Sequence, residues 1–205
     1  MNIVVRDLFE TSDTALVLVG DARRAAIETI KTHHYTHSAP SGKSHYMAFR
    51  DAIVVWSLPA NYNLAKFILG WKGILWELSR LWAPDGHERN LLTMAISASV
   101  RRLVEIEHPD AVVSYADPNA GHSGGVYRAA SWIAHGQSDE IRAYRSVDGK
   151  IVARRAFHSG QKFLVKSEIE QLGYCQLNLP GKHRFVRFLS KRARKALHQC
   201  DARSQ

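Results

Sequence analysis

The sequence is poor in cysteine and has no long hydrophobic run. Its 205 residues include only Cys175 and Cys200, which lie far apart and lack the spacing of metal-ligand motifs. They are typical of free thiols in a reducing cytoplasm. No apolar run approaches the roughly 20 residues of a membrane span, and residues 1–7 lack the layout of a signal peptide. We therefore expect a cytoplasmic protein with no membrane partner.

Acidic residues are also scarce relative to basic ones. The chain has 28 Lys and Arg against 19 Asp and Glu, a net charge of +9 and a pI near 9.8. This balance favours partners with phosphate backbones and predicts binding that weakens with salt. Much of the charge lies in an expected basic helix at about 182–198, for which a solvated surface role is an equal alternative. The candidate nucleic-acid-binding residues are Lys182, Arg184, Arg187, Lys191, Arg192, Arg194 and Lys195.

The remaining pattern predicts alternating strands and helices within one domain, residues 1–205. Hydrophobic residues make up 45% of the chain, enough for a substantial core. The order indicates an α/β (α+β) fold around a mixed sheet. Strands are expected at 2–7, 46–56, 74–82 and 111–115, helices at 20–31, 91–106 and 125–133, and a hairpin between 140–144 and 150–158.

The block from Ser114 to Trp132 carries the strongest functional signal. An apolar run at 111–113 leads into Ser114, Tyr115, Asp117 and His122 among closely spaced glycines, and a helix is expected from Gly125. Titratable side chains at the end of a buried strand, beside a helix N-terminus, are typical of a catalytic loop. The alternative is an ordinary Gly-rich turn, which needs Gly, Pro and Asn but not this set of polar residues.

Polar and charged residues also interrupt the apolar strand that ends at Trp82. Glu77, Ser79 and Arg80 lie within it, and strict alternation would place Arg80 on the face opposite Glu77 and Ser79. They indicate either a structural salt bridge or a cleft shared with Ser114 and Asp117.

These motifs together resemble the Mom family of phage DNA-modification proteins. The resemblance rests on His34-Tyr35, Glu77 to Trp82, Ser114-Tyr-Ala-Asp with Gly121-His, Tyr127-Arg-Ala and Lys182-His-Arg-Phe, and covers about residues 20–195. It implies conversion of adenine in DNA to its N6-carbamoylmethyl derivative, which protects phage DNA from restriction enzymes. It also implies a GNAT-like acyltransferase fold, with a mixed, splayed β-sheet flanked by helices.

The resemblance also implies roles for individual residues. Tyr127 would protonate the leaving group, although a tyrosine on an apolar helix face is more often part of the core, and Asp117 would orient or deprotonate the adenine amine. Ser114 and His34 complete the candidate catalytic set. The adenine must leave the duplex to react. The candidate substrate-binding residues are Tyr35, Lys43, Glu77, Ser79, Arg80, Tyr115, His122 and Arg128.

The donor of the transferred group is the main departure from GNAT enzymes. Leu92 and Met94 fill positions where a coenzyme A loop has glycine or alanine, so acetyl-coenzyme A is disfavoured. Glycyl-tRNA is the preferred activated donor, because glycine supplies both carbons of the product group and a nitrogen. Iron is a further candidate cofactor, with His33 and His37 as potential ligands if both lie on one helix.

Two other functions remain open. One is a GNAT-type N-acetyltransferase that acts on a protein or a small amine. The other is a non-catalytic nucleic-acid-binding protein. The leading interpretation is an acyltransferase-like enzyme that modifies adenine N6 in double-stranded DNA, with tRNA as a second nucleic-acid partner.

Overall fold

The protein is described by a computed structural model over residues 13–154, 157–159 and 162–195. The strand expected at 2–7 lies outside these residues. The chain forms two compact units. The first runs to Tyr115 and adds Gly124–His135 and the residues from Arg184, whereas the second contains Ala116–Ser123 and Gly136–His183. The single domain expected from chain length stays a prediction.

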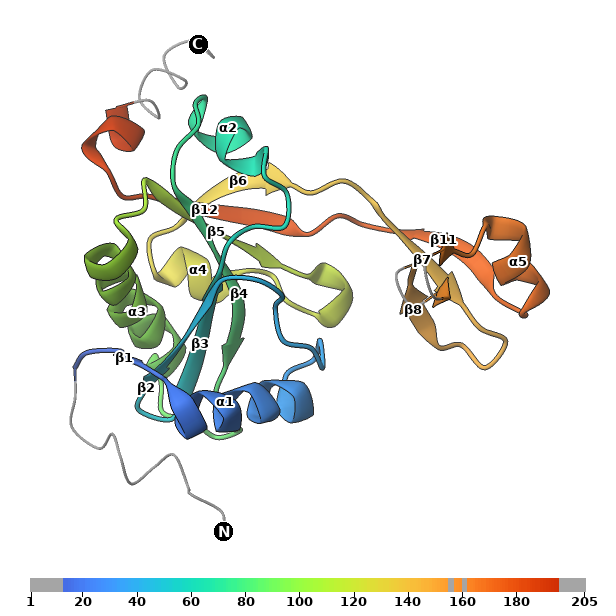
Figure 1. The fold of residues 1–205 in the computed structure, drawn as a ribbon, viewed down its shortest axis with the longest axis horizontal. Helices are drawn as coiled ribbons and strands as arrows, with labels where there is room; N and C mark the ends of the chain where they lie inside the picture. Colours follow the sequence, from blue (N-terminus) through green and yellow to red (C-terminus); the bar gives the residue numbers. More distant parts are fainter. Residues whose placement is uncertain (1–12, 155–156, 160–161, 196–205) are drawn as a thin grey trace. The chain divides into compact units, whose positions relative to one another are not determined.

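A mixed sheet forms the centre of the first unit (Figure 1). Its order is β1-β2-β3-β4-β5-β12-β6, in which the first four strands are antiparallel and β4 pairs with β5 in parallel. This confirms the expected mixed sheet. The strands are β1 (Leu16–Val17), β2 (Ser44–Phe49), β3 (Ala52–Ser57), β4 (Leu75–Trp82), β5 (Ala111–Ala116), β12 (His183–Phe188) and β6 (Ile133–Gln137).

Helices cover both faces of this sheet. α1 packs Ala26 and Ile30 against the side chains of Ile53 and Val55. Because side chains alternate along a strand, Trp56 faces the opposite side, where α3 packs. Short α2 buries its apolar side against β4 and β5. The helices are α1 (Gly20–His33), α2 (Leu64–Leu69), α3 (Leu91–Glu107) and α4 (Gly125–Ala129). The expected helix-flanked fold is confirmed, and α1, α3, β4 and β5 lie close to their predicted positions.

The second unit has a small core of its own. Tyr144, Phe157 and Ile169 are buried together. The expected hairpin is confirmed, since β7 pairs with β8, although β8 is shorter than the predicted strand. The elements are η2 (Pro118–Ala120), β7 (Ile141–Arg145), β8 (Ile151–Ala153), β9 (His158–Ser159), β10 (Lys162–Phe163), α5 (Lys166–Gln171) and β11 (Cys175–Leu179).

Two predicted elements are divided differently in the structure. The strand expected at 46–56 is a hairpin of β2 and β3, and its turn includes Arg50 in the left-handed region at φ 50°. The helix expected at 125–133 ends at Ala129, and β6 begins at Ile133. Both errors arise because the two turns, at residues 50–51 and 130–132, lack the glycine or proline that usually marks a break between elements.

The basic helix expected at about 182–198 is wrong over its first half. Residues 183–188 form strand β12, which lies inside the sheet between β5 and β6. In this strand the adjacent Phe185 and Val186 are both buried, one on each face, and such a short run cannot be told from a helix by periodicity. A helical stretch begins only at Lys191, and the Ser190 hydroxyl accepts a hydrogen bond from the Ala193 N–H at 3.1 Å.

Among the described residues, no helix has the length and apolar content to cross a membrane.

Candidate functional site

The parallel strands β4 and β5 pair over only part of their length. Their ladder runs from the Leu75–Ala111 pair to the Leu78–Ser114 pair, although β4 continues to Trp82. The carboxyl ends of the two strands are therefore unpaired with each other beyond Ser114. Ligands of open sheets bind at the carboxyl ends of parallel strands, so this is the first place to look for a site.

A buried hydroxyl pair lies at this point. Ser114 Oγ lies 2.8 Å from the Leu78 carbonyl oxygen and 2.8 Å from the Tyr127 hydroxyl oxygen. A serine hydroxyl has one proton and a carbonyl only accepts, so Tyr127 donates to Ser114 when Ser114 donates to Leu78. If Ser114 instead rotates to donate to Tyr127, the tyrosine proton becomes available to another acceptor. The pair can therefore hold the tyrosine proton in two arrangements.

Tyr127 is held in this position by aromatic packing. Its ring lies 5.5 Å from the Trp132 ring and 5.2 Å from the Phe185 ring. Gly124, at φ 80°, lets Phe185 approach, because a Cβ at this position would overlap the ring. Burial raises the pKa of Tyr127 to about 12, opposed by the hydrogen bond from Ser114. The hydroxyl therefore stays protonated at neutral pH.

Glu77 acts electrostatically on the hydroxyls of Tyr127 and Tyr115. Negative charge on Glu77 and on Tyr35 adds to the rise in the pKa of Tyr127. Burial also raises the pKa of Tyr115, opposed by a hydrogen bond from Arg184, while Glu77 raises it further. In the first unit the charge of Glu77 therefore acts on two tyrosines predicted for the site, of which Tyr127 holds its proton at neutral pH.

His34 and Tyr35 follow the end of α1. The His34 Nδ1 accepts a hydrogen bond from the Thr36 N–H at 3.2 Å and lies 2.9 Å from the Thr36 hydroxyl. In neutral His34 the proton therefore resides on Nε2. The His34 and Tyr35 rings lie 4.6 Å apart, and Tyr35 is partly exposed. This segment presents a phenol next to a buried imidazole.

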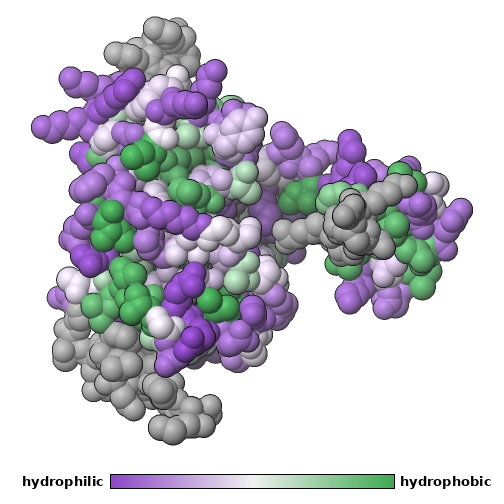
Figure 2. Space-filling model, in the orientation of Figure 1, coloured by the Kyte–Doolittle hydropathy of each residue, from purple (hydrophilic) through white to green (hydrophobic). Residues whose placement is uncertain are grey.

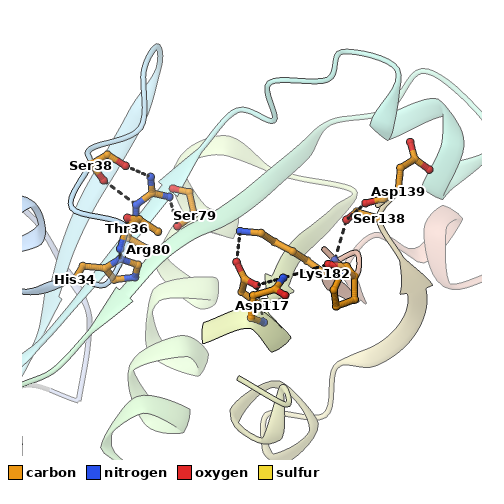
Figure 3. A network of polar contacts seen from close by, with 11 residues as sticks. His34, Thr36, Ser38, Ser79, Arg80, Asp117, Ser138, Asp139 and Lys182 are labelled. Carbon is orange, nitrogen blue, oxygen red and sulfur yellow. Dashed lines mark hydrogen bonds and ion pairs between the residues drawn. The ribbon is translucent and has the colours of Figure 1, made fainter. Parts of the chain in front are cut away.

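Arg80 ties the same loop to β4. Its Nε donates to the Ser38 carbonyl oxygen at 2.8 Å, and its Nη2 donates to the Ser38 hydroxyl at 3.0 Å (Figure 3). Opposite Val55 the strand register shifts, so Ser79 is an extra residue, and its hydroxyl donates to the Val55 carbonyl at 3.1 Å. The strict alternation expected for this strand is therefore wrong beyond Leu78. The side chains of Arg80 and Ser79 thus hold the backbone at Ser38 and at Val55 in place.

Lys43 belongs to a separate polar cluster. Its ammonium lies 2.7 Å from the Glu107 carboxylate, which also accepts from His45 Nε2 at 2.7 Å. The His45 ring stacks on Trp76 at 5.0 Å. Burial opposes ionisation of Glu107, but the bonds to Lys43 and His45 outweigh it, so its pKa is lowered. The cluster fastens the start of β2 to the end of α3.

Asp117 is paired within the second unit. Its carboxylate lies 2.8 Å from Lys182 Nζ (Figure 3), and it accepts a hydrogen bond from the Asn119 N–H at 3.0 Å, which caps η2. Burial alone would raise the pKa of Asp117, but Lys182 and Asn119 outweigh it and lower the pKa. A carboxylate held charged in this way suits orientation better than proton acceptance.

Two further predicted residues, His122 and Arg128, are exposed. The His122 N–H donates to the Asp117 carbonyl at 3.0 Å, which closes the loop after β5. The Arg128 guanidinium lies 5.6 Å from the Phe185 ring centroid. Both side chains can meet a ligand from solvent.

The histidines proposed as metal ligands do not share a helix. α1 ends at His33, whose ring packs against Trp82 at 5.7 Å. His37 has a φ of 45°, and its Nδ1 lies 3.1 Å from the Lys31 carbonyl. The described part of the chain contains no group of three or more His, Cys, Asp or Glu that could hold a metal. These residues do not fit iron.

The predicted nucleic-acid-binding residues separate onto two faces of the sheet. Because β12 is a strand, Arg184 and Arg187 point to opposite faces. Burial lowers the pKa of Arg187, and the charges of Arg194 and Arg101 add to this effect. The four basic residues of the helical stretch at 191–195 are all exposed.

An aromatic cluster around Arg184 was not predicted from the sequence. Arg184 Cζ lies 4.9 Å from the Phe67 ring centroid and 5.8 Å from that of Tyr115. Phe67 also meets His135 edge-on at 6.1 Å, and burial lowers the pKa of this histidine. Phe67 lies in an apolar segment whose sequence is also compatible with a core helix, so nothing marked it as exposed.

Two matches to known proteins bear on these residues. The model of the Mom protein family matches residues 18–204. Methylcarbamoylase mom of Escherichia phage Mu is 27% identical over 184 residues, which cover 82% of this chain and 73% of that protein. The family match includes every residue of the site described above.

Proposed function

Because the chain belongs to the Mom protein family, we propose that it is an enzyme that modifies phage DNA. Its similarity to a methylcarbamoylase supports transfer of a carbamoylmethyl group. The substrate is adenine in double-stranded DNA, the product is N6-carbamoylmethyladenine, and the modification protects phage DNA from restriction. The observation that carries this proposal is the buried Tyr127–Ser114 pair where the β4–β5 ladder ends.

The reaction begins with acyl transfer to the exocyclic amine. Adenine N6 attacks the carbonyl carbon of an activated glycine ester, so a C–N bond forms and the ester C–O bond breaks. We assign the amine proton to Glu77, whose charge acts on both Tyr115 and Tyr127. The leaving alkoxide takes its proton from Tyr127, and Ser114 donates to the resulting phenolate. A positioned acid or base contributes about 10²–10⁴ in rate.

A rearrangement then gives the product without a redox step. The free amine of the N6-glycyl group attacks ring carbon C6 and forms a five-membered ring. Cleavage of the original C6–N6 bond leaves the glycine nitrogen on C6 and converts the original N6 into the terminal amide. Atoms and charge balance, because the step is an isomerisation.

The activated glycine is best supplied as glycyl-tRNA. At the start of α3, Leu92 and Met94 carry partly buried side chains where a pyrophosphate loop needs close backbone approach, and the Leu91 N–H already donates to the Glu88 carbonyl at 3.2 Å. These residues do not fit coenzyme A, and no step uses it. The net charge of +9 suits both DNA and tRNA.

The proposal is tested by mass spectrometry of nucleosides from plasmid DNA after expression in a bacterium fed glycine labelled on both carbons and nitrogen. We expect a modified adenine that carries all three labels. Label from acetate but not from glycine would refute the glycyl donor. An unmodified adenine pool in cells that contain folded, soluble protein would refute the enzyme itself.

A further inference from the structure

One exposed aromatic side chain lies on a guanidinium near the proposed site. Phe67 of α2 is 64% exposed, and Arg184 lies 4.9 Å from its ring centroid. Arg184 is itself buried and donates from Nη1 to the His135 carbonyl at 3.2 Å. A ring fixed in this way loses little freedom when a flat ligand stacks on it.

The same guanidinium connects Phe67 with the reacting groups. Arg184 is 5.8 Å from the Tyr115 ring centroid and hydrogen-bonds its hydroxyl. The charge of Glu77, which we assign as the base, in turn raises the pKa of Tyr115. The exposed ring and the proposed base are therefore linked through one buried arginine and one tyrosine.

The segment around Phe67 carries positive charge and exposed aromatic surface. Residues 52–76 contain no Asp or Glu but include Lys66 and Lys72. Tyr62 is 88% exposed, and Arg192 lies 4.4 Å from the Trp71 ring centroid. Aromatic rings among cations are the combination that binds unpaired nucleic-acid strands, because bases stack and phosphates pair.

The exposed apolar surface is too scattered for a large protein interface on the face shown in Figure 2. There, apolar residues form small separate groups between hydrophilic ones. Large contiguous apolar patches mark protein or membrane contacts. A polar partner therefore suits this face better than an apolar one.

We propose that Phe67, supported by Arg184, is a stacking platform for an unpaired base of the DNA substrate. The inference rests on the proposed function, in which adenine must leave the duplex. Extrusion of a base costs stacking energy, and stacking on an aromatic side chain restores part of it.

The test compares binding of two duplexes of equal length by fluorescence anisotropy. One duplex is fully paired, and the other holds one adenine opposite an abasic site. Phe67→Ala should weaken binding of the second duplex about 5- to 150-fold, the usual effect of losing one base stack, and change the first less than about twofold. Phe67→Trp should retain binding, because it keeps a ring.

Phe163→Ala is the matched control, because Phe163 is also half-exposed but lies in the second unit. Phe163→Ala should not change the binding of either duplex. The platform would be overturned if Phe67→Ala weakened binding of both duplexes equally or weakened neither. A third probe is single-stranded RNA with the sequence of a tRNA 3′ end, and a loss of binding confined to it would also overturn the platform. The assay needs no chemistry, so a selective loss would support it even if no modified adenine were found.

Discussion

Replacing Tyr127 by Phe tests the proton-donor role directly. The variant keeps the ring contacts with Trp132 and Phe185 and removes only the hydroxyl that lies 2.8 Å from Ser114. If Tyr127 protonates the leaving group, the yield of modified adenine should fall about 10²–10⁴-fold. Stability should change little, by about 0.5–1.5 kcal/mol, because Ser114 can still donate to the Leu78 carbonyl.

The pH dependence of stability gives an independent check. The pKa of Tyr127 is about 12 in the folded state, against about 10 when unfolded. Its contribution is therefore fully present below pH 10 and is lost as pH rises from about 10 to 12. A difference of two pKa units corresponds to about 2–3 kcal/mol. Urea unfolding between pH 8 and 11 should show a smaller alkaline loss for Tyr127→Phe than for the wild type.

Ser114→Ala separates the chemical role of the hydroxyl pair from simple packing. It leaves the Tyr127 hydroxyl in place but removes the group that would stabilise the phenolate. We expect an intermediate loss of modification, smaller than that of Tyr127→Phe. Full activity of soluble Tyr127→Phe protein, measured by nucleoside mass spectrometry, would refute the acid role and leave Tyr127 with a structural role only.

Three further changes test other parts of the molecule. Asp117→Asn should lower the adenine yield less than about tenfold, because a carboxylate paired with a lysine orients rather than accepts a proton; a loss of 10³ by mass spectrometry would contradict this. Neutralising Arg192, Arg194 and Lys195 together should flatten the salt slope of DNA binding by about 0.9 per lost phosphate contact, and an unchanged slope in anisotropy titrations would make them solvated surface. Glu107→Gln should make the free energy of unfolding less sensitive to acid. The lowered pKa of Glu107 stabilises the folded state above about pH 4, and this contribution is lost as pH falls. The same pH dependence in wild type and variant, measured by urea unfolding from pH 3 to 7, would disprove it.

Elements whose sequence has a clear period were predictable. α3 is long and amphipathic, and β4 is rich in aromatic and apolar residues, so each was placed within about one residue of its observed bounds. β12 was not, because Phe185, Val186 and Phe188 suit a helix stripe as well as a strand buried on both faces. Only the neighbouring strands decide between them.

The candidate site was predictable as a set of residue types but not as contacts. Ser114 and Tyr127 were both named from the sequence, yet the bond between them depends on how α4 packs against the end of β5. Lys43 was expected at the substrate, whereas its partner Glu107 is 64 residues away in the chain. Such pairs carry no local signal, because side-chain partners are chosen by the tertiary structure.

The chain between β6 and β12 makes an excursion that leaves the sheet and returns to it at one point. Gln137 Nε2 lies 3.2 Å from His183 Nδ1, and the Ser138 N–H donates to the Lys182 carbonyl at 2.9 Å. Gly181 permits this crossing, because a Cβ there would overlap the Ser138 carbonyl. Since entry and exit are adjacent, the 139–181 segment can lengthen, shrink or be exchanged in evolution without a change in strand register elsewhere. The excursion is therefore a module whose length is independent of the sheet that carries Ser114 and Arg184.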